Sequence, residues 1–93
     1  MIESFGDKET ESISNGIRSR KLPNDIQQRA RRKLRMIDQA QDLRDLRVPP
    51  SNHLESLRGD LKGFWSIRIN DQWRIIFRWR DALKRDVSIV DYH

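Results

Sequence analysis

The pattern of residues 73–80 constrains the fold more than any other part of this 93-residue chain, because two kinds of side chain alternate along it. One set of alternate positions is apolar (Trp73, Ile75, Phe77 and Trp79), and the other set is mainly arginine (Arg74, Ile76, Arg78 and Arg80). Successive side chains of a β-strand point to opposite faces, so this pattern predicts a strand over residues 73–79 with one apolar and one cationic face. We expect helices to cover the apolar face and the arginine face to stay open.

Three further segments share this period of two. Residues 54–57, 64–69 and 86–90 are predicted as strands, because alternating apolar residues are bounded there by turn sequences. The short connections predict antiparallel hairpins, and in the simplest register Arg68 lies beside Arg74. Residues 1–5 alternate enough to form a short first strand.

The clearest helix is predicted to begin after Pro23. Asn24 is suited to cap it, and Gln27 stands three residues later, as in a capping box. Apolar residues then recur at the spacing of one helical face: Ile26, Ala30, Leu34, Ile37 and Ala40. Lys33 falls within this stripe and is expected to extend its ammonium outward along its aliphatic stem. The prolines of residues 48–52 predict a loop after the helix.

The predicted helix lies in the first half of the chain, and most of the predicted strands lie in the second half. Residues 6–22 are mostly polar and contain few residues suited to a core, so they are predicted to be flexible or only weakly helical. A chain of this length is expected to form one small domain, spanning residues 1–93, that buries only about 60–65% of its unfolded surface.

Positive charge is concentrated in one short segment. Residues 17–35 contain eight basic residues against one acidic residue, a net charge of +7, whereas the whole chain carries +5. Three of these arginines, Arg31, Arg32 and Arg35, point away from the apolar stripe of the predicted helix. A nucleic acid or an acidic protein is the expected partner of this segment, and the alternative is a solvated helix face.

Several classes of site are excluded by composition. Cysteine is absent, which rules out disulfides and thiolate metal sites, and His53 and His93 are the only imidazoles. We therefore expect neither a metal nor a cofactor. No stretch approaches the roughly 18 apolar residues of a membrane span, and residues 1–5 do not begin a signal sequence. The chain is expected to be cytoplasmic and to make no membrane contact.

Asp91, Tyr92 and His93 bring a carboxylate, a phenol and an imidazole together in a chain of positive charge. Histidine titrates near neutral pH, and cations can stabilise the charge that builds up on a phosphate during cleavage. This combination predicts proton transfer on a polyanion, for which RNA is our choice. On an extended strand, Asp91 and His93 share a face and Tyr92 lies opposite them. The alternatives are a solvated tail for His93 and a position at the edge of the core for Tyr92.

Two stretches of the sequence resemble a known family. The run GFWSIRINDQWRIIF at residues 63–77 and the closing VDYH at residues 90–93 resemble the HigB toxins of the RelE/ParE superfamily, and the likeness extends over residues 24–93. The resemblance implies a RelE-like α+β domain in which N-terminal helices pack on a twisted, mainly antiparallel sheet. It also implies a metal-independent ribonuclease that cleaves mRNA in the ribosomal A site. The implied partner is a HigA-like helix-turn-helix antitoxin, through which alone operator DNA would be bound.

By position, the resemblance implies catalytic roles for five residues: Arg58, Arg74, Asp91, Tyr92 and His93. Arg58 stands where relatives often have a lysine. At two positions the chain departs from the family's pattern. Glu55 stands where some relatives have a histidine, and His53 lies two positions earlier. Asn70 stands where an arginine can occur, with Arg68 two residues before it.

The other arginines are assigned to binding. We expect contacts to RNA or the ribosome from the sheet and from the helix (Arg68, Arg78, Arg31, Arg32 and Arg35). Glu55 is expected to pair with a neighbouring arginine rather than to act as a base.

A second class of function fits the same charges. The superfamily includes gyrase-poisoning members like ParE, and a cationic sheet can also serve as a non-catalytic module that binds RNA or a partner. Only the nuclease hypothesis gives the titrating residues 91–93 a role, so His93 separates the two readings.

Overall fold

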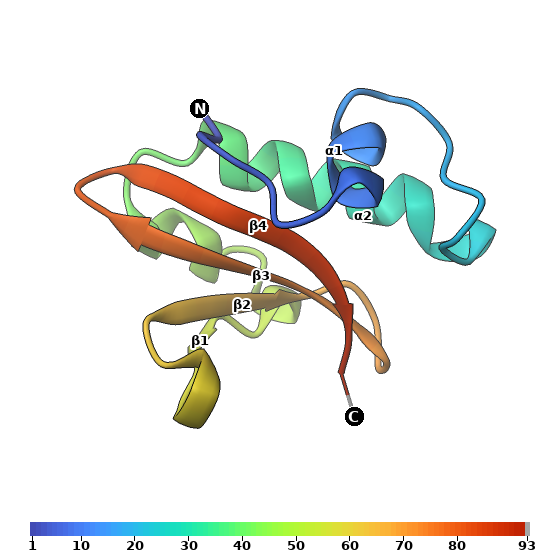
Figure 1. The fold of residues 1–93 in the computed structure, drawn as a ribbon. Helices are drawn as coiled ribbons and strands as arrows, with labels where there is room; N and C mark the ends of the chain where they lie inside the picture. Colours follow the sequence, from blue (N-terminus) through green and yellow to red (C-terminus); the bar gives the residue numbers. More distant parts are fainter. Residues whose placement is uncertain (93) are drawn as a thin grey trace.

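The computed structural model describes residues 1–92, which form a helical layer on one face of a sheet (Figure 1). The two α-helices of this part of the chain are α1 (Lys8–Ser14) and α2 (Asn24–Gln39). The antiparallel strands lie in the order β1 (Glu55–Ser56), β2 (Phe64–Arg68), β3 (Trp73–Arg80) and β4 (Leu83–Asp91). Short 3-10 turns occur at Leu43–Arg47, Pro50–Asn52 and Gly59–Leu61. The predicted α+β architecture is confirmed.

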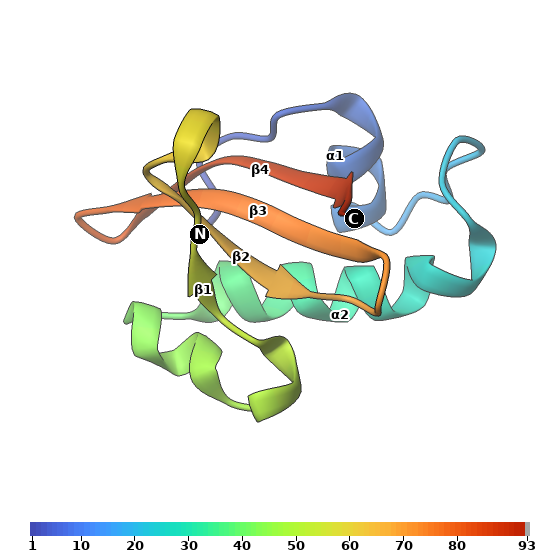
Figure 2. The same ribbon diagram turned by 90° about the horizontal axis from the view of Figure 1, so that it is seen from below.

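Strand β3 has the two faces that its sequence predicts. Ile75 and Phe77 are fully buried, and Trp73 and Trp79 pack against the same core, which α2 covers (Figure 2). On the opposite face Arg78 is exposed, although Ile76 beside it is buried. Alternation along the strand therefore separates the core from the arginines.

The predicted register of the β2–β3 hairpin is also confirmed. Arg68 pairs with Arg74 and Ser66 with Ile76, so the alternating sets of β2 and β3 share their faces. Strand β4 begins at Leu83, three residues before the predicted start, because Asp81 and Ala82 turn the chain with φ of 52° and 66°. This is the backbone of a two-residue hairpin turn, which usually contains glycine or asparagine. Strand β1 has two residues, fewer than predicted.

Helix α2 buries the predicted apolar stripe: Ile26, Ala30, Leu34, Ile37 and, just after the helix, Ala40. Its predicted capping box is wrong. Asn24 accepts a hydrogen bond from Arg18 Nε, and the Gln27 amide donates to the carbonyls of Ser19 and Leu22. Gln27 also accepts a hydrogen bond from the backbone N–H of Ser19, so it fixes the preceding loop instead of the helix end.

Lys33 does not extend into solvent as expected. The residue is 8% exposed, and its ammonium donates a hydrogen bond to Oδ1 of Asn52, which is fully buried. The Asn52 amide in turn donates to the carbonyl of Leu46 at 3.1 Å. Burial lowers the pKa of Lys33, and the nearby guanidinium groups of Arg29 and Arg32 lower it further. These contacts attach the loop after α2 to the middle of that helix.

The N-terminal part of the chain contributes more to the core than its sequence indicates. Residues 1–5 form two isolated parallel bridges to β4 rather than a strand, at Ile2 and Phe5. Asp7 caps α1 by accepting from the Thr10 N–H at 2.7 Å, and the Thr10 hydroxyl accepts from the Ile89 N–H of β4. Thr10 and Ile13 are buried, so the expectation of few core residues is wrong here. The flexibility of residues 6–22 stays a prediction.

Among residues 1–92, none of the helices combines the length and the apolar character needed to cross a membrane.

The buried contact between Lys33 and Asn52 predicts a large effect on stability. Replacing Asn52 with Ala removes the partner of a buried ammonium and of the Leu46 carbonyl, so we expect unfolding free energy to fall by about 2 kcal/mol or more. Urea denaturation measures this change. The neighbouring exposed Ser51→Ala is the control, with an expected change within about 0.5 kcal/mol. Equal midpoints for the two variants would contradict a structural role for Asn52.

Candidate functional site

Arg74 lies on the arginine face of the sheet, near the start of β3. Its Nη1 atom is 3.0 Å from the Ser66 hydroxyl and 3.1 Å from Glu55 Oε1. Its guanidinium carbon lies 4.8 Å from the centroid of the Tyr92 ring. The Arg74 side chain is 16% exposed, against 47% for Glu55. These four residues, the Arg74 cluster, hold a largely buried cation in one orientation.

The pairing of the strands brings this cluster together. Glu55 on β1 lies opposite Ser66 on β2, and Ser66 lies opposite Ile76, two residues after Arg74 on β3. Arg74 therefore reaches both side chains diagonally across the face. Tyr92 follows the end of β4, where its N–H donates to the carbonyl of Gln72 at 2.6 Å. Residues from three strands and from the segment after β4 thus meet around one guanidinium.

The structure separates Asp91 from the Arg74 cluster. Asp91 pairs with Trp73, whose side chain belongs to the opposite face from Arg74, and its Oδ2 accepts a hydrogen bond from Gln72 Nε2 at 3.1 Å. Tyr92 contacts Arg74 through its ring, and it is 40% exposed. His93, the third member, lies outside the described residues.

A second pair of arginine and aromatic side chains lies beside the cluster. Arg78 lies directly opposite Phe64, and its guanidinium carbon is 4.6 Å from the Phe64 ring centroid. Its Nε is 3.4 Å from Asp86 Oδ2, and both side chains are 54% exposed. Arginine planes and aromatic rings both accept stacked bases, so this part of the face offers a surface suited to single-stranded RNA.

Arg68 and Arg58 are not members of the Arg74 cluster as it is defined above. Arg68 opposes Arg74, but its Nε donates to the Asn70 carbonyl at 3.1 Å and its Nη2 pairs with Asp71. Arg58 is exposed in the turn between β1 and β2, just before the 3-10 turn Gly59–Leu61. His53 is exposed in a loop with a positive φ of 46°.

The predicted binding arginines of α2 do not join the Arg74 face, because α2 covers the opposite face of the sheet (Figure 2). Arg31 and Arg35 line a hollow shared with Ser14 of α1. Arg32 instead lines a cavity together with Arg68. The structure therefore divides these residues between two surfaces.

Ser66 and Phe64 were missed as members of the site by the sequence reasoning. The signal was present, because both alternate with core residues on β2 and so share the face of the arginines. The pairing of Glu55 with an arginine was predicted, and the 3.1 Å contact with Arg74 confirms it.

The sequence is similar to known toxins over nearly its whole length. Residues 3–93 match the family model of HigB-like toxins, described as the RelE-like toxin of the type II toxin–antitoxin system HigB. The chain is 44% identical to Toxin HigB-1 of Vibrio cholerae over 84 residues, which cover 89% of this chain and 88% of that protein. It is 31% identical to Endoribonuclease HigB of Proteus vulgaris over 94 residues, which cover 100% of both chains.

Solved structures share the fold at low sequence identity. A mutant of YafQ from E. coli superposes with a TM-score of 0.66 at 12% identity, covering 98% of this chain and 93% of YafQ. A chain of the YoeB–YefM complex from Staphylococcus aureus superposes with a TM-score of 0.61 at 18% identity, covering 100% of this chain and 98% of that one. Together with the family match over residues 3–93, these findings show that the chain belongs to the HigB-like family, the RelE-like toxins of type II toxin–antitoxin systems.

Proposed function

We propose that this HigB-like toxin is an endoribonuclease that cleaves mRNA in the ribosomal A site and so inhibits translation. The observation that carries the proposal is the Arg74 cluster, in which a largely buried guanidinium is fixed on an open sheet face beside Tyr92. The family match supports it, as does the 31% identity to a protein named as an endoribonuclease.

The proposed reaction uses the 2′-hydroxyl of the RNA as the nucleophile. A base removes its proton, the oxygen attacks the adjacent phosphorus, and the bond to the 5′-oxygen of the next nucleotide breaks. An acid returns a proton to that oxygen, so the products are a 2′,3′-cyclic phosphate and a 5′-hydroxyl. The phosphorane between these steps carries extra negative charge, which fixed cations must stabilise.

Arg74 is suited to stabilise that charge. Contacts with Ser66 and Glu55 fix its guanidinium before RNA binds, so little reorganisation is needed when charge develops. Because its side chain is 16% exposed, solvent screens its charge less than that of the exposed Arg78. A planar guanidinium can also donate two parallel hydrogen bonds to a phosphate, which a lysine cannot do.

The closing residues are assigned the proton transfers. His93 acts as the base or the acid, since imidazole titrates near neutral pH. Asp91 orients it, and Tyr92 stacks on a base or orients the phosphate from its position over Arg74. Arg58 approaches the leaving oxygen from the turn after β1.

The remaining arginines are assigned to the ribosomal complex. Arg78 with Phe64 supports the RNA chain beside the Arg74 cluster. Arg31 and Arg35 of α2 lie behind the sheet, where they face ribosomal RNA rather than the cleaved message. Arg32 instead binds RNA from the cavity that it lines together with Arg68. A HigA-like helix-turn-helix antitoxin neutralises the toxin in the cytoplasm and alone carries the complex to operator DNA.

Substitution of Arg74 tests its proposed role. We expect Arg74→Ala to reduce the single-turnover cleavage rate of ribosome-bound mRNA by roughly 10²-fold or more, and Arg74→Lys to recover only part of it. Arg80→Ala, at the exposed end of the same strand, is the matched control and should cleave at nearly the normal rate. Equal losses in the Arg74 and Arg80 variants would assign the effect to the overall charge of the face.

A second prediction separates positioning from proton transfer at Glu55. If this carboxylate only holds Arg74, Glu55→Gln keeps an acceptor for the guanidinium and should slow cleavage by less than roughly tenfold. The shape of the pH–rate profile should also stay unchanged. Loss of the acidic limb of that profile in the variant would identify Glu55 as the general base instead.

His93 decides between a nuclease and a binding module. In an in vitro translation reaction with a defined mRNA, primer extension should show new 5′ ends that require ribosomes and disappear with His93→Ala. The variant's circular dichroism spectrum and melting temperature should match those of the unaltered protein. Intact mRNA at toxin concentrations that still arrest growth would contradict the nuclease, and gyrase would be the next target to assay.

A further inference from the structure

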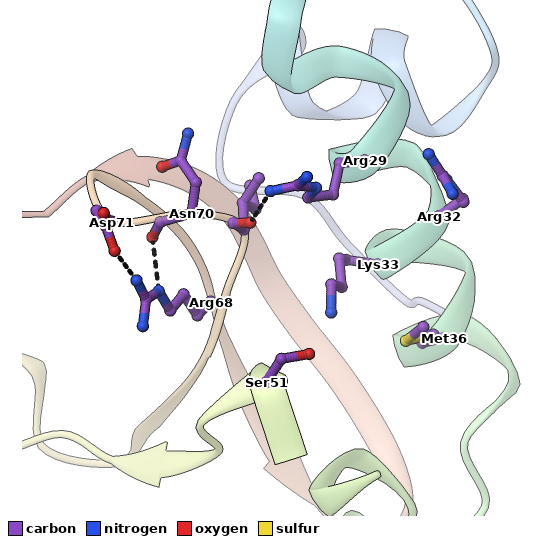
Figure 3. A pocket seen from close by; sticks show the side chains of 9 residues that line it. Arg29, Arg32, Lys33, Met36, Ser51, Arg68, Asn70 and Asp71 are labelled. Carbon is purple, nitrogen blue, oxygen red and sulfur yellow. Dashed lines mark hydrogen bonds and ion pairs between the residues drawn. The ribbon is translucent and has the colours of Figure 1, made fainter. Parts of the chain in front are cut away.

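A cavity of about 660 Å³ lies between α2 and the turn that joins β2 to β3 (Figure 3). Cations from two elements line it: Arg29, Arg32 and Lys33 come from α2, and Arg68 comes from the end of β2. Ser51 and Asp71 add a hydroxyl and a carboxylate to the wall. The lining therefore carries four basic groups against one acidic group.

Contacts with the protein hold three of these cations in place around the cavity. Arg29 Nη1 donates to the Ile69 carbonyl at 3.2 Å, and Lys33 donates to Asn52. Arg68 Nε donates to the Asn70 carbonyl at 3.1 Å. The positions of these cations are thus fixed before any ligand arrives, which lowers the entropic cost of binding one.

Like charges brought together in this way destabilise one another. Burial lowers the pKa of Lys33, and the charges of Arg29 and Arg32 lower it further. A bound anion would relieve this repulsion and would favour the charged form of Lys33. The arrangement is therefore better matched to a complex with an anion than to the free protein.

The cavity adjoins the face that carries the Arg74 cluster. Arg68 pairs directly with Arg74 and lies two residues beyond Ser66, a separation of roughly 6.5 Å along a strand. Strand β1 pairs with Trp65 and Ser66, so it stops short of Arg68. A chain of phosphates on the Arg74 face can therefore continue around this edge of β2 into the cavity.

We propose that this cavity binds one phosphate of the RNA strand, next to the phosphate that is cleaved on the Arg74 face. The inference rests on the proposed nuclease function, and it adds Arg29 and Lys33 to the residues that recognise the substrate. Guanidinium groups match phosphate oxygens with paired donors, and the lysine supplies a further point charge.

Asp71 acts as an internal competitor for this phosphate. Its carboxylate pairs with Arg68, although its own side chain is 95% exposed. An arriving phosphate displaces the carboxylate and takes over the guanidinium. Removing the charge with Asp71→Asn should therefore strengthen binding.

Titration of the free protein with inorganic phosphate tests the site without ribosomes. We expect NMR signals of the Lys33 ammonium and the Arg29, Arg32 and Arg68 guanidinium groups to shift together along one binding curve. The double variant R29Q/R32Q should bind phosphate roughly tenfold more weakly, because two charged donors are lost. Asp71→Asn should bind severalfold more tightly. The double variant R20Q/R47Q, which removes two exposed arginines outside the cavity, is the charge-matched control.

Two variants distinguish an error in the proposed phosphate site from an error in the proposed nuclease function. Arg74→Ala should lose cleavage yet keep the phosphate titration at the cavity. The R29Q/R32Q variant should raise the toxin concentration needed for half-maximal cleavage and leave the maximal rate within about twofold. Unchanged phosphate binding in R29Q/R32Q, or tighter binding of a polyglutamate peptide than of a short RNA at this cavity, would overturn the proposal. The second result would assign the cavity to an acidic protein partner.

Discussion

Burial of Ile75 and Phe77 against α2 determines the direction in which Arg74 and Arg78 point. Each of these apolar side chains contributes about 1.5–3 kcal/mol when it leaves water. A shift of one residue in the pairing of β3 would expose them and turn the arginines into the core, where unpaired charges are far more costly. Packing on one face of the sheet thus fixes the chemistry available on the other.

On the arginine face, the exposed fraction of the side chain distinguishes Arg74 from Arg78. Arg74 is anchored by Ser66 and Glu55 and is 16% exposed, whereas the Arg78 side chain is 54% exposed. A fixed, poorly solvated guanidinium stabilises developing charge more strongly than a mobile, solvated one. Arg74 is for this reason the proposed centre of catalysis, and Arg78 with Phe64 is a proposed support for the RNA chain. The carboxylate of Glu55 reduces the net positive charge of the Arg74 cluster, and its ion pair with Arg74 holds that side chain in one orientation.

Patterns that repeat along a single element could be predicted from the sequence. The period of two gave the faces of β3 and the pairing of Arg68 with Arg74, and the helical period gave the buried stripe of α2. The contact of Glu55 with an arginine also followed from the strand pattern.

Contacts between distant segments could not be predicted in the same way. Asn52, which is 19 residues from Lys33, accepts a hydrogen bond from its ammonium. The Gln27 amide donates to the Ser19 carbonyl in the loop before α2 instead of capping the helix. Thr10 is buried, and its hydroxyl accepts a hydrogen bond from the N–H of Ile89, across 79 residues of sequence. The cavity between α2 and β2 likewise depends on how the helical layer packs on the sheet. A repeating pattern within one helix or strand does not predict that packing.

In the proposed mechanism, the arginine face stabilises the charge that develops when the 2′-hydroxyl attacks the neighbouring phosphate. The most direct measurement is single-turnover cleavage of ribosome-bound mRNA that carries 2′-deoxyribose only at the nucleotide 5′ of the cleaved bond. We expect this message to remain intact, while the unmodified message yields a 2′,3′-cyclic phosphate and a 5′-hydroxyl. Cleavage of the deoxy message at the same bond, leaving a 5′-phosphate, would contradict this mechanism.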